Sequence, residues 1–340
     1  MTLTTKEIAY LSPSFTQQTA ISLFSNIKAT QDGTEYDKLS KKGIIQGNGY
    51  EAQALEMLMQ IAKPQRCARI IAKNEFFVIE KYSYRSDDKI LLVENSNGEF
   101  IFKKIEDFND VIIGLSEIFS MSNIKTADVK VLLKADEMIV LLAIIDIYRK
   151  NTLLNYAGNS NQAEIISLQE ITNELSKGYE NGLVKILIKN YAYKMPMERE
   201  IAQLLASLVE KKCLVFKQGY KLSQNYALLA TNFLVLDALI LLENFQVMAN
   251  GDVISNGGFF ATAGVHNIIS FVFEDDNILL SSMSAFQMLS TIESVLECPV
   301  FAEEIVQTAQ TPPPINNIWQ CTCGKTNTAN FCPTCGSKRV

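Results

Sequence analysis

The sequence predicts an α+β protein with two pseudo-symmetric halves, each an antiparallel sheet flanked by helices, followed by a small C-terminal unit rich in cysteine. Three observations lead to this prediction. A strand-turn-strand-helix pattern occurs twice, a second pattern precedes each copy at a similar distance, and four of the seven cysteines lie in the last twenty residues. The length of 340 residues is consistent with about two domains.

The first copy of the repeated pattern covers residues 89–118. Two apolar runs flank Asn97-Gly98, a dipeptide suited to a type I′ hairpin turn, and an amphipathic helix follows. The pattern returns 178 residues later, at 267–296, where the turn falls on residues 275–277. Without a gap, the apolar positions Ile90, Val93, Phe102, Phe108 and Val111 fall on Ile268, Phe271, Leu280, Phe286 and Leu289.

A second pair of matching segments lies upstream. Residues 41–50, which begin Lys-Lys-Gly-Ile-Ile, match residues 211–220, which begin Lys-Lys-Cys-Leu-Val, at an offset of 170. Two matches in the same order predict a duplicated unit. The alternative is a common pattern that has arisen twice by chance.

The first half, residues 1–124, reads as helices followed by a sheet and a closing helix. We expect a helix over 14–28, a short helix that runs into a hairpin over 36–50, and a helix over 51–62. Pro64 ends that last helix, and strands are expected over 67–71 and 76–84.

The second half, residues 125–306, begins with a strong helix over 136–150. Residues 151–206 have no counterpart in the first half and read as inserted helices, one of them capped by Ser167 with Glu170. A hairpin over 213–222 and a helix over 225–242 follow.

Residues 245–264 contain two turn dipeptides, Asn250-Gly251 and Asn256-Gly257. The glycine-rich loop expected after the second makes Phe259 and Phe260 candidate contacts for a protein partner. The alternative, that both phenylalanines belong to the core, remains open.

Composition limits the functional classes. The formal net charge of −6 argues against a protein that binds nucleic acid over its whole surface. The longest apolar windows, 139–148 and 228–242, each contain an aspartate and are shorter than a membrane span, so we expect buried helices and no membrane insertion. No secretory signal is visible, and we expect a cytoplasmic protein.

The C-terminal cysteines carry the strongest chemical signal. A polar, proline-rich linker over 307–317 leads to residues 318–340, where the spacing C-x-C-x8-C-x2-C is typical of a structural Zn²⁺ site that leaves no position open for water. A redox dithiol pair is the alternative. The predicted ligands are Cys321, Cys323, Cys332 and Cys335. The other three cysteines lie in apolar surroundings and are expected to be buried thiols: Cys67, Cys213 and Cys298.

The body offers little for catalysis, and we expect no enzyme. His266 is the only histidine, and no phosphate or dinucleotide loop is complete. Residues 167–222 read helix, helix, helix, hairpin with an excess of lysine. That order is compatible with a winged helix, so a DNA-binding regulator is the alternative function.

Two resemblances add to these predictions. The tail resembles bacterial zinc ribbons and, more loosely, RanBP2-type zinc fingers, but it lacks the arginines with which those fingers read RNA. Residues 5–300 resemble the EspG family, the cytosolic chaperones of type VII (ESX) secretion. The resemblance rests on Leu39-x3-Gly43-Ile44-x4-Gly49 before a helix, on Pro64-x-Arg66, and on the hairpin-helix units at 89–118 and 267–296. It implies a non-enzymatic chaperone or adaptor that binds a helical secretion substrate.

Overall fold

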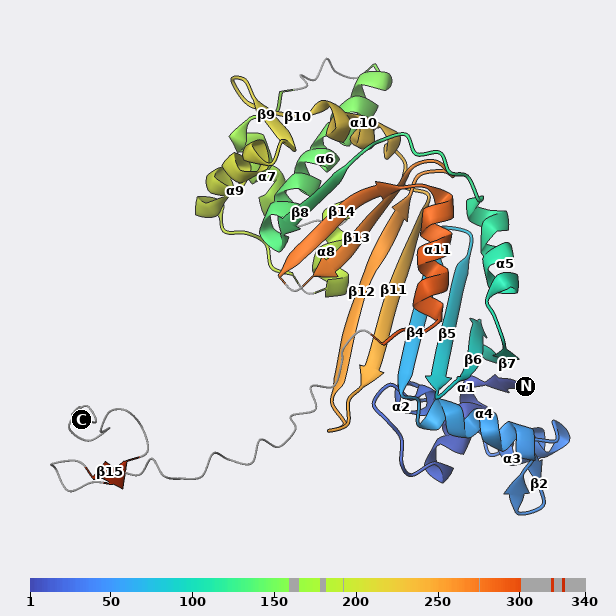
Figure 1. Ribbon diagram of the computed structural model, residues 1–340. Helices are drawn as coiled ribbons and strands as arrows, with labels where there is room; N and C mark the ends of the chain where they lie inside the picture. The colour runs from blue at the N-terminus through green and yellow to red at the C-terminus, as the bar shows by residue number, and fades with distance from the viewer. Residues whose placement is uncertain are drawn as a thin grey trace. The chain divides into compact units, whose positions relative to one another are not determined.

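The computed structural model describes residues 1–158, 165–177, 182–191, 193–274, 276–300, 319–320 and 326–327. Residues 1–302 form one compact unit and residues 303–340 another. The first unit is built on a ten-stranded antiparallel sheet with the strand order β1-β7-β6-β5-β4-β11-β12-β13-β14-β8 (Figure 1). Its strands are β1 Thr2–Thr4, β4 Arg66–Lys73, β5 Val78–Ser86, β6 Lys89–Ser96, β7 Glu99–Ile105, β8 Lys130–Lys134, β11 Ala238–Val247, β12 Val253–Thr262, β13 Ile268–Glu274 and β14 Asn277–Met283.

Helices and two short hairpins surround this sheet. The hairpins pair β2 Ile45–Gln46 with β3 Gly49–Tyr50, and β9 Leu214–Phe216 with β10 Tyr220–Leu222. The helices are α1 Thr5–Leu11, η1 Ser12–Ser14, α2 Leu23–Asn26, α3 Glu35–Lys41, α4 Ala52–Ala62, α5 Asn109–Phe119, α6 Ala135–Tyr156, α7 Leu168–Ser176, α8 Leu183–Tyr191, α9 Glu198–Glu210, α10 Gln224–Asn232 and α11 Ala285–Leu296.

The strand order repeats about the centre of the sheet. The first half supplies β1, β7, β6, β5 and β4, and the second half supplies β11, β12, β13, β14 and β8. The halves meet where β4 pairs with β11, with Ile70 opposite Leu242. Each half also has a helix-hairpin-helix segment before its long strands and one helix after them. The predicted fold class, an antiparallel sheet in two pseudo-symmetric halves with flanking helices, is therefore confirmed.

The register of the two repeated hairpins matches the predicted alignment. Ile90 pairs with Ile105 and Ile268 pairs with Met283, so both strands of the hairpin recur at the offset of 178 (90 to 268 and 105 to 283). Between α1 and α3 the first half has only η1 and the four-residue α2, whereas α7 and α8 lie between α6 and α9. These two helices make the halves unequal.

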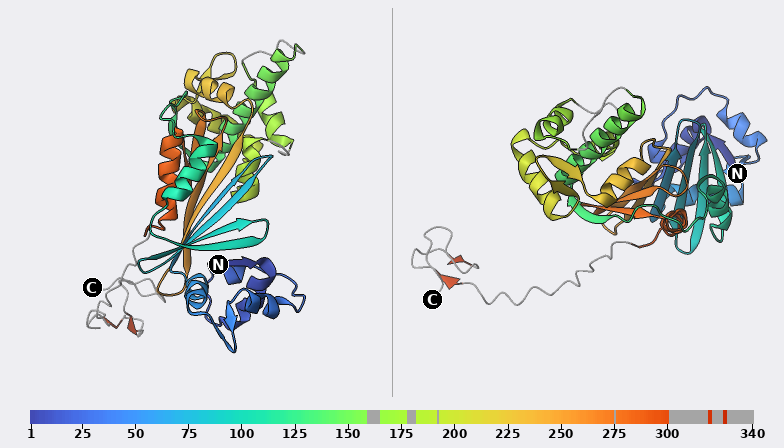
Figure 2. Two further views of the ribbon diagram at one scale, coloured as in Figure 1. Left: turned by 90° about the vertical axis from the view of Figure 1, so that its right-hand side faces the viewer. Right: turned by 90° about the horizontal axis from the view of Figure 1, so that it is seen from above.

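Three apolar cores lie against the sheet. α5 and α11 cover one face around the junction of the halves, where Ile70, Leu242 and Phe260 are buried. On the opposite face, α1–α4 cover the first half and α6–α10 cover the second half in two separate cores (Figure 2). The face opposite α5 and α11 is therefore covered by two separate groups of helices.

Three local predictions were wrong. The helix expected over 14–28 is reduced to η1 and α2. The helix expected over 225–242 ends at Asn232, and Ala238 begins β11. Because both faces of this central strand are covered along residues 238–242, its apolar run lacks the alternation of a half-exposed strand. Asn256-Gly257 lies inside β12, and the turn between β11 and β12 is at Asn250-Gly251.

No helix within the described residues is long and apolar enough to cross a membrane. In the C-terminal unit the described residues are two short strands, β15 Trp319–Gln320 and β16 Thr326–Asn327, which pair antiparallel.

Candidate functional site

An uncovered strip of sheet lies between the two groups of helices on the face opposite α11. Along β11, Leu239 and Leu241 pack against the core under α6–α10, while Phe245 and Val247 pack against the core under α1–α4. Glu243 points to the same face between these pairs, because alternate residues of a strand share a face. We call this strip, with its neighbours on β4 and β5, the central groove.

A charged cluster crosses the central groove. The Arg69 guanidinium donates a hydrogen bond of 2.9 Å to Glu80 and lies 3.5 Å from the carboxylate of Glu243. Glu80 also accepts hydrogen bonds from the Tyr82 hydroxyl at 2.6 Å and from the Asn95 amide. Four strands are thereby joined through side chains, and two carboxylates share one guanidinium.

The pKa shifts in the cluster follow from burial and from these contacts. Burial alone would raise the pKa of Glu80, but donation from Tyr82, Arg69 and Asn95 holds it below its usual value. Burial and the hydrogen bond to Glu80 raise the pKa of the Tyr82 hydroxyl well above its ordinary value. Glu80 is therefore ionised at neutral pH, and the Tyr82 hydroxyl keeps its proton.

A hollow of about 490 Å³ adjoins the cluster at the first-half end of the central groove. Arg69 and Tyr82 form part of its wall. The rest is mainly apolar and comes from the sheet and from the segment 20–27, including Ile21, Leu23, Ile27, Tyr84, Phe245 and Val253. Its size and lining suit a large apolar side chain from a binding partner.

Exposed apolar residues lie at the other end of the central groove. Val78 is 67% exposed and precedes Glu80 by two positions on β5, so it faces the groove. Phe76, in the turn between β4 and β5, is 91% exposed. The groove thus combines a charged centre, an apolar hollow and uncovered apolar side chains, a combination that suits protein recognition.

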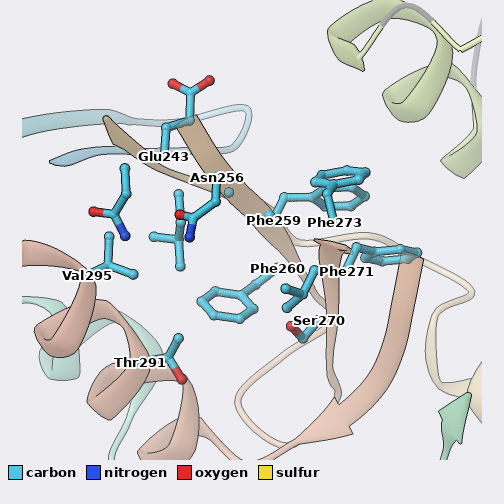
Figure 3. Close-up of a pocket in the computed structure, with 14 residues that line it drawn as sticks. Glu243, Asn256, Phe259, Phe260, Ser270, Phe271, Phe273, Thr291 and Val295 are labelled. Atoms are coloured by element: carbon cyan, nitrogen blue, oxygen red, sulfur yellow. The ribbon is translucent and has the colours of Figure 1, made fainter. Parts of the chain in front are cut away.

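The structure places Phe259 and Phe260 within β12 and not in a loop. They are 3% and 2% exposed and point to opposite faces of the sheet. The Phe259 ring stacks on Phe271 at 4.2 Å between centroids, whereas Phe260 points toward α11 (Figure 3). As core residues they present no surface to a partner in this conformation.

A second hollow of about 200 Å³ lies between β11–β13 and α11, near Thr291 and Val295 (Figure 3). Gly258 forms part of its wall, and a Cβ atom there would overlap the carbonyl oxygen of Phe271. Glu243 points away from α11 in the same view, toward the central groove.

The four predicted zinc ligands, Cys321, Cys323, Cys332 and Cys335, lie outside the described residues. Within the residues that are described, no group of three or more histidine, cysteine or acidic side chains could hold a metal ion. Cys67, Cys213 and Cys298 are buried free thiols, as predicted. Burial raises the pKa of each of these thiols.

The segment proposed as a winged helix has the expected elements. Ile166 forms a bridge with Tyr220, which adds one residue pair on the edge of β10 that faces away from β9. The exposed positions of α9, however, carry two acidic residues and one basic residue: Glu198, Arg199, Ala202, Gln203, Ala206 and Glu210. On α8, Leu183, Val184 and Leu187 are buried in the core. The exposed positions of α9 therefore do not form the basic face that contact with phosphates requires.

Sequence reasoning missed the central groove. Arg69, Glu80 and Glu243 come from three strands, and only the pairing of β4 with both β5 and β11 brings them together. The available signal was the glutamate at 243, directly after an apolar run, which is unusual for a central strand. Taken alone, the apolar run that precedes Glu243 favours a helix, and within a predicted helix this glutamate is not unusual.

The ten-stranded antiparallel sheet in two related halves, with an uncovered strip between two groups of helices on one face, defines a two-repeat α+β protein. Among solved structures, the fold is similar to that of EspG5, the type VII secretion system chaperone of Mycobacterium tuberculosis, determined in complex with a PE25–PPE41 dimer. The TM-score is 0.50 at 7% sequence identity, over 89% of this chain and 98% of that chain. No protein family and no curated protein matches the sequence. The comparison supports an EspG-like fold.

Proposed function

We propose that the chain is a non-enzymatic, cytoplasmic chaperone or adaptor that binds a helical protein partner of the type VII secretion substrate class. The observation that carries the proposal is the central groove, a strip of sheet left uncovered between two helix groups. The fold is shared with a chaperone whose solved complex contains a PE25–PPE41 dimer.

The groove suits an amphipathic helix. Val78 and Phe76 are exposed, and the hollow under residues 20–27 can take one large apolar side chain. Burial of apolar surface contributes about 25 cal/mol per Å² before the costs of ordering are subtracted. Because α7 and α8 are present in one half only, the groove has unequal walls, and a single asymmetric partner can bind in one orientation.

The position of binding can be tested by site-specific crosslinking in native cells. A photoreactive side chain at Val78 should crosslink to a protein with predicted helical hairpins. The same group at Ile113, which is 57% exposed on α5 over the opposite face, serves as the matched control. Equal crosslinking from both positions would contradict the proposed site.

The salt dependence of the captured complex separates this function from the alternative. Binding that buries mainly apolar surface should survive moderate salt. Binding of duplex DNA through lysines should weaken steeply with salt. Recovery of nucleic acid alone, lost as the salt concentration rises, would replace the chaperone proposal with the DNA-binding alternative.

We also propose that residues 318–340 fold around one structural Zn²⁺ held by the four C-terminal cysteines. The support is their spacing in the sequence. A segment this short has no apolar core of its own and depends on a metal to fold.

A further inference from the structure

The β9–β10 hairpin brings exposed apolar side chains to one end of the second half (upper left in Figure 1). We call residues 211–222 the wing. Val215 is 41% exposed and Phe216 is 59% exposed, although Leu214 and Leu222 in the same hairpin are buried. Phe216 pairs with Tyr220, and their ring centroids are 5.1 Å apart. The apolar character of the wing therefore continues from the core out to its tip.

The apolar surface extends beyond the wing. Ile165 and Leu168, just before and at the start of α7, are each 43% exposed. Two backbone hydrogen bonds of 2.8 Å between Ile166 and Tyr220 hold this segment against β10. A Cβ atom on Gly219 would lie 2.5 Å from Cγ2 of Ile165, so the glycine allows direct contact between the two segments.

Basic residues accompany these apolar side chains. From position 211 to position 236 the chain has four lysines and no acidic residue, in a protein whose net charge is −6. Lys211 is paired with Glu137, and Lys212 and Lys217 are exposed on the wing. The nearest acidic group on α7, Glu170, accepts hydrogen bonds from Ser167. The wing is therefore a local positive region on an acidic protein.

The matching hairpin of the first half lacks the positive charge of the wing. Residues 43–50, which contain β2 and β3, have no charged side chain and turn through Gly47. The basic, apolar tip thus belongs to one half only and is not a requirement of the repeated fold.

We propose that the wing docks reversibly on an anionic lipid surface. Val215 and Phe216 would enter the boundary between headgroups and acyl chains, and Lys212 and Lys217 would face the lipid anions. Apolar side chains at the tip of a basic hairpin suit a membrane interface better than a nucleic-acid groove, because phosphate contact alone needs no apolar tip. The proposal goes beyond binding of a protein partner and does not depend on it.

Sedimentation of the full chain with lipid vesicles tests this inference. We expect binding to phosphatidylcholine vesicles that contain phosphatidylserine, little binding to phosphatidylcholine alone, and weaker binding as salt rises. Phe216→Ser and Lys217→Glu should each weaken binding about fivefold, because each removes one of the two attractive contributions.

Matched controls come from α3, the helix that precedes the corresponding hairpin of the first half. Tyr36→Ser removes an exposed aromatic that bonds to the Gly47 carbonyl, and Lys41→Glu reverses an exposed charge beside it. Both should bind vesicles like the parent chain. Equal sedimentation with both lipid compositions, or binding unchanged by Phe216→Ser and Lys217→Glu, would overturn the inference. Salt-sensitive retention of duplex DNA that Lys217→Glu abolishes, without vesicle binding, would assign the wing to nucleic acid.

Discussion

Lys42 forms an ion pair of 2.7 Å with Glu7, a carboxylate whose side chain is only 1% exposed. Glu7 lies in the first turn of α1 and also accepts from the backbone N–H of Thr4, while Lys42 also donates to the carbonyl of Thr2. The second half repeats this arrangement. Lys211 pairs with Glu137 at 2.6 Å, Glu137 accepts from the N–H of Lys134, and Lys211 donates to the carbonyl of Leu132. The duplication therefore extends to individual polar contacts.

The first prediction concerns the removal of one partner from this pair. Lys211→Met should destabilise the protein by about 3 kcal/mol, because the buried carboxylate of Glu137 loses its counter-charge. Adding Glu137→Leu should recover much of that loss, since an apolar pair leaves no buried charge. Urea unfolding of the two variants measures both effects. A double variant less stable than Lys211→Met alone would contradict the explanation.

The repeated ion pair also tests the predicted alignment of residues 41–50 with residues 211–220. Lys42 and Lys211 each follow the last residue of a helix, and Gly43 and Lys212 each have positive φ. The structural offset is therefore 169 (42 to 211), and the sequence-based offset of 170 was wrong by one. Two adjacent lysines in each copy can be aligned in either register, and only the helix ends decide between them.

In the hairpin-helix unit, too, the predicted alignment is wrong by one residue. The strands keep the predicted offset of 178, but Phe108 is 3% exposed while its predicted match, Phe286, is 44% exposed. Ala285 is buried at the position that corresponds to Phe108, an offset of 177. Alternation fixes a strand register strongly, whereas the short link before the helix can lose a residue without changing the helix pattern. The sheet and the repeat were predictable, but the central groove depended on strand order, which local patterns do not contain.

The second prediction concerns pH. Burial alone would raise the pKa of Glu137, but hydrogen bonds from Lys211, Ser207 and the Lys134 N–H lower it below its usual value of 4.5. A depressed pKa in the folded state gives stability that is present above the unfolded pKa and is lost as the pH falls through the folded pKa. Glu137→Gln should therefore reduce stability at neutral pH and flatten its decline below about pH 5. The exposed Glu106→Gln is the control, and a parallel shift without a change in slope would contradict this assignment.

The third prediction uses two glycines with opposite surroundings. A Cβ atom at Gly258 would overlap the Phe271 carbonyl on β13, whereas one at Gly114 in α5 would meet nothing within 4 Å. Gly258→Ala should destabilise the protein by about 2 kcal/mol, because β12 and β13 must separate. Gly114→Ala should stabilise it by up to about 1 kcal/mol through helix propensity. Thermal unfolding of both variants measures the difference, and a neutral Gly258→Ala would mean that the strands can move apart freely.

The fourth prediction is one zinc ion per chain. The spacing of Cys321, Cys323, Cys332 and Cys335 can supply four thiolates, and thiolate ligands make the affinity for Zn²⁺ depend on pH. Metal analysis of the purified full chain should give one equivalent of zinc, and changing all four cysteines to serine should remove it. Changing Cys67, Cys213 and Cys298 to serine should leave the zinc content unaltered, because these thiols are buried in the body.

Removal of zinc should affect the C-terminal segment 318–340 and leave the body, residues 1–302, unchanged. Residues 1–302 form a compact unit with three cores of their own, so chelation of zinc should leave the unfolding transition of that unit unchanged. Protease sensitivity after residue 317 should increase on chelation, because a segment without an apolar core depends on the metal for its fold. Zinc retained by the quadruple serine variant, or a tail equally protected with and without the metal, would show that these cysteines do not form the site.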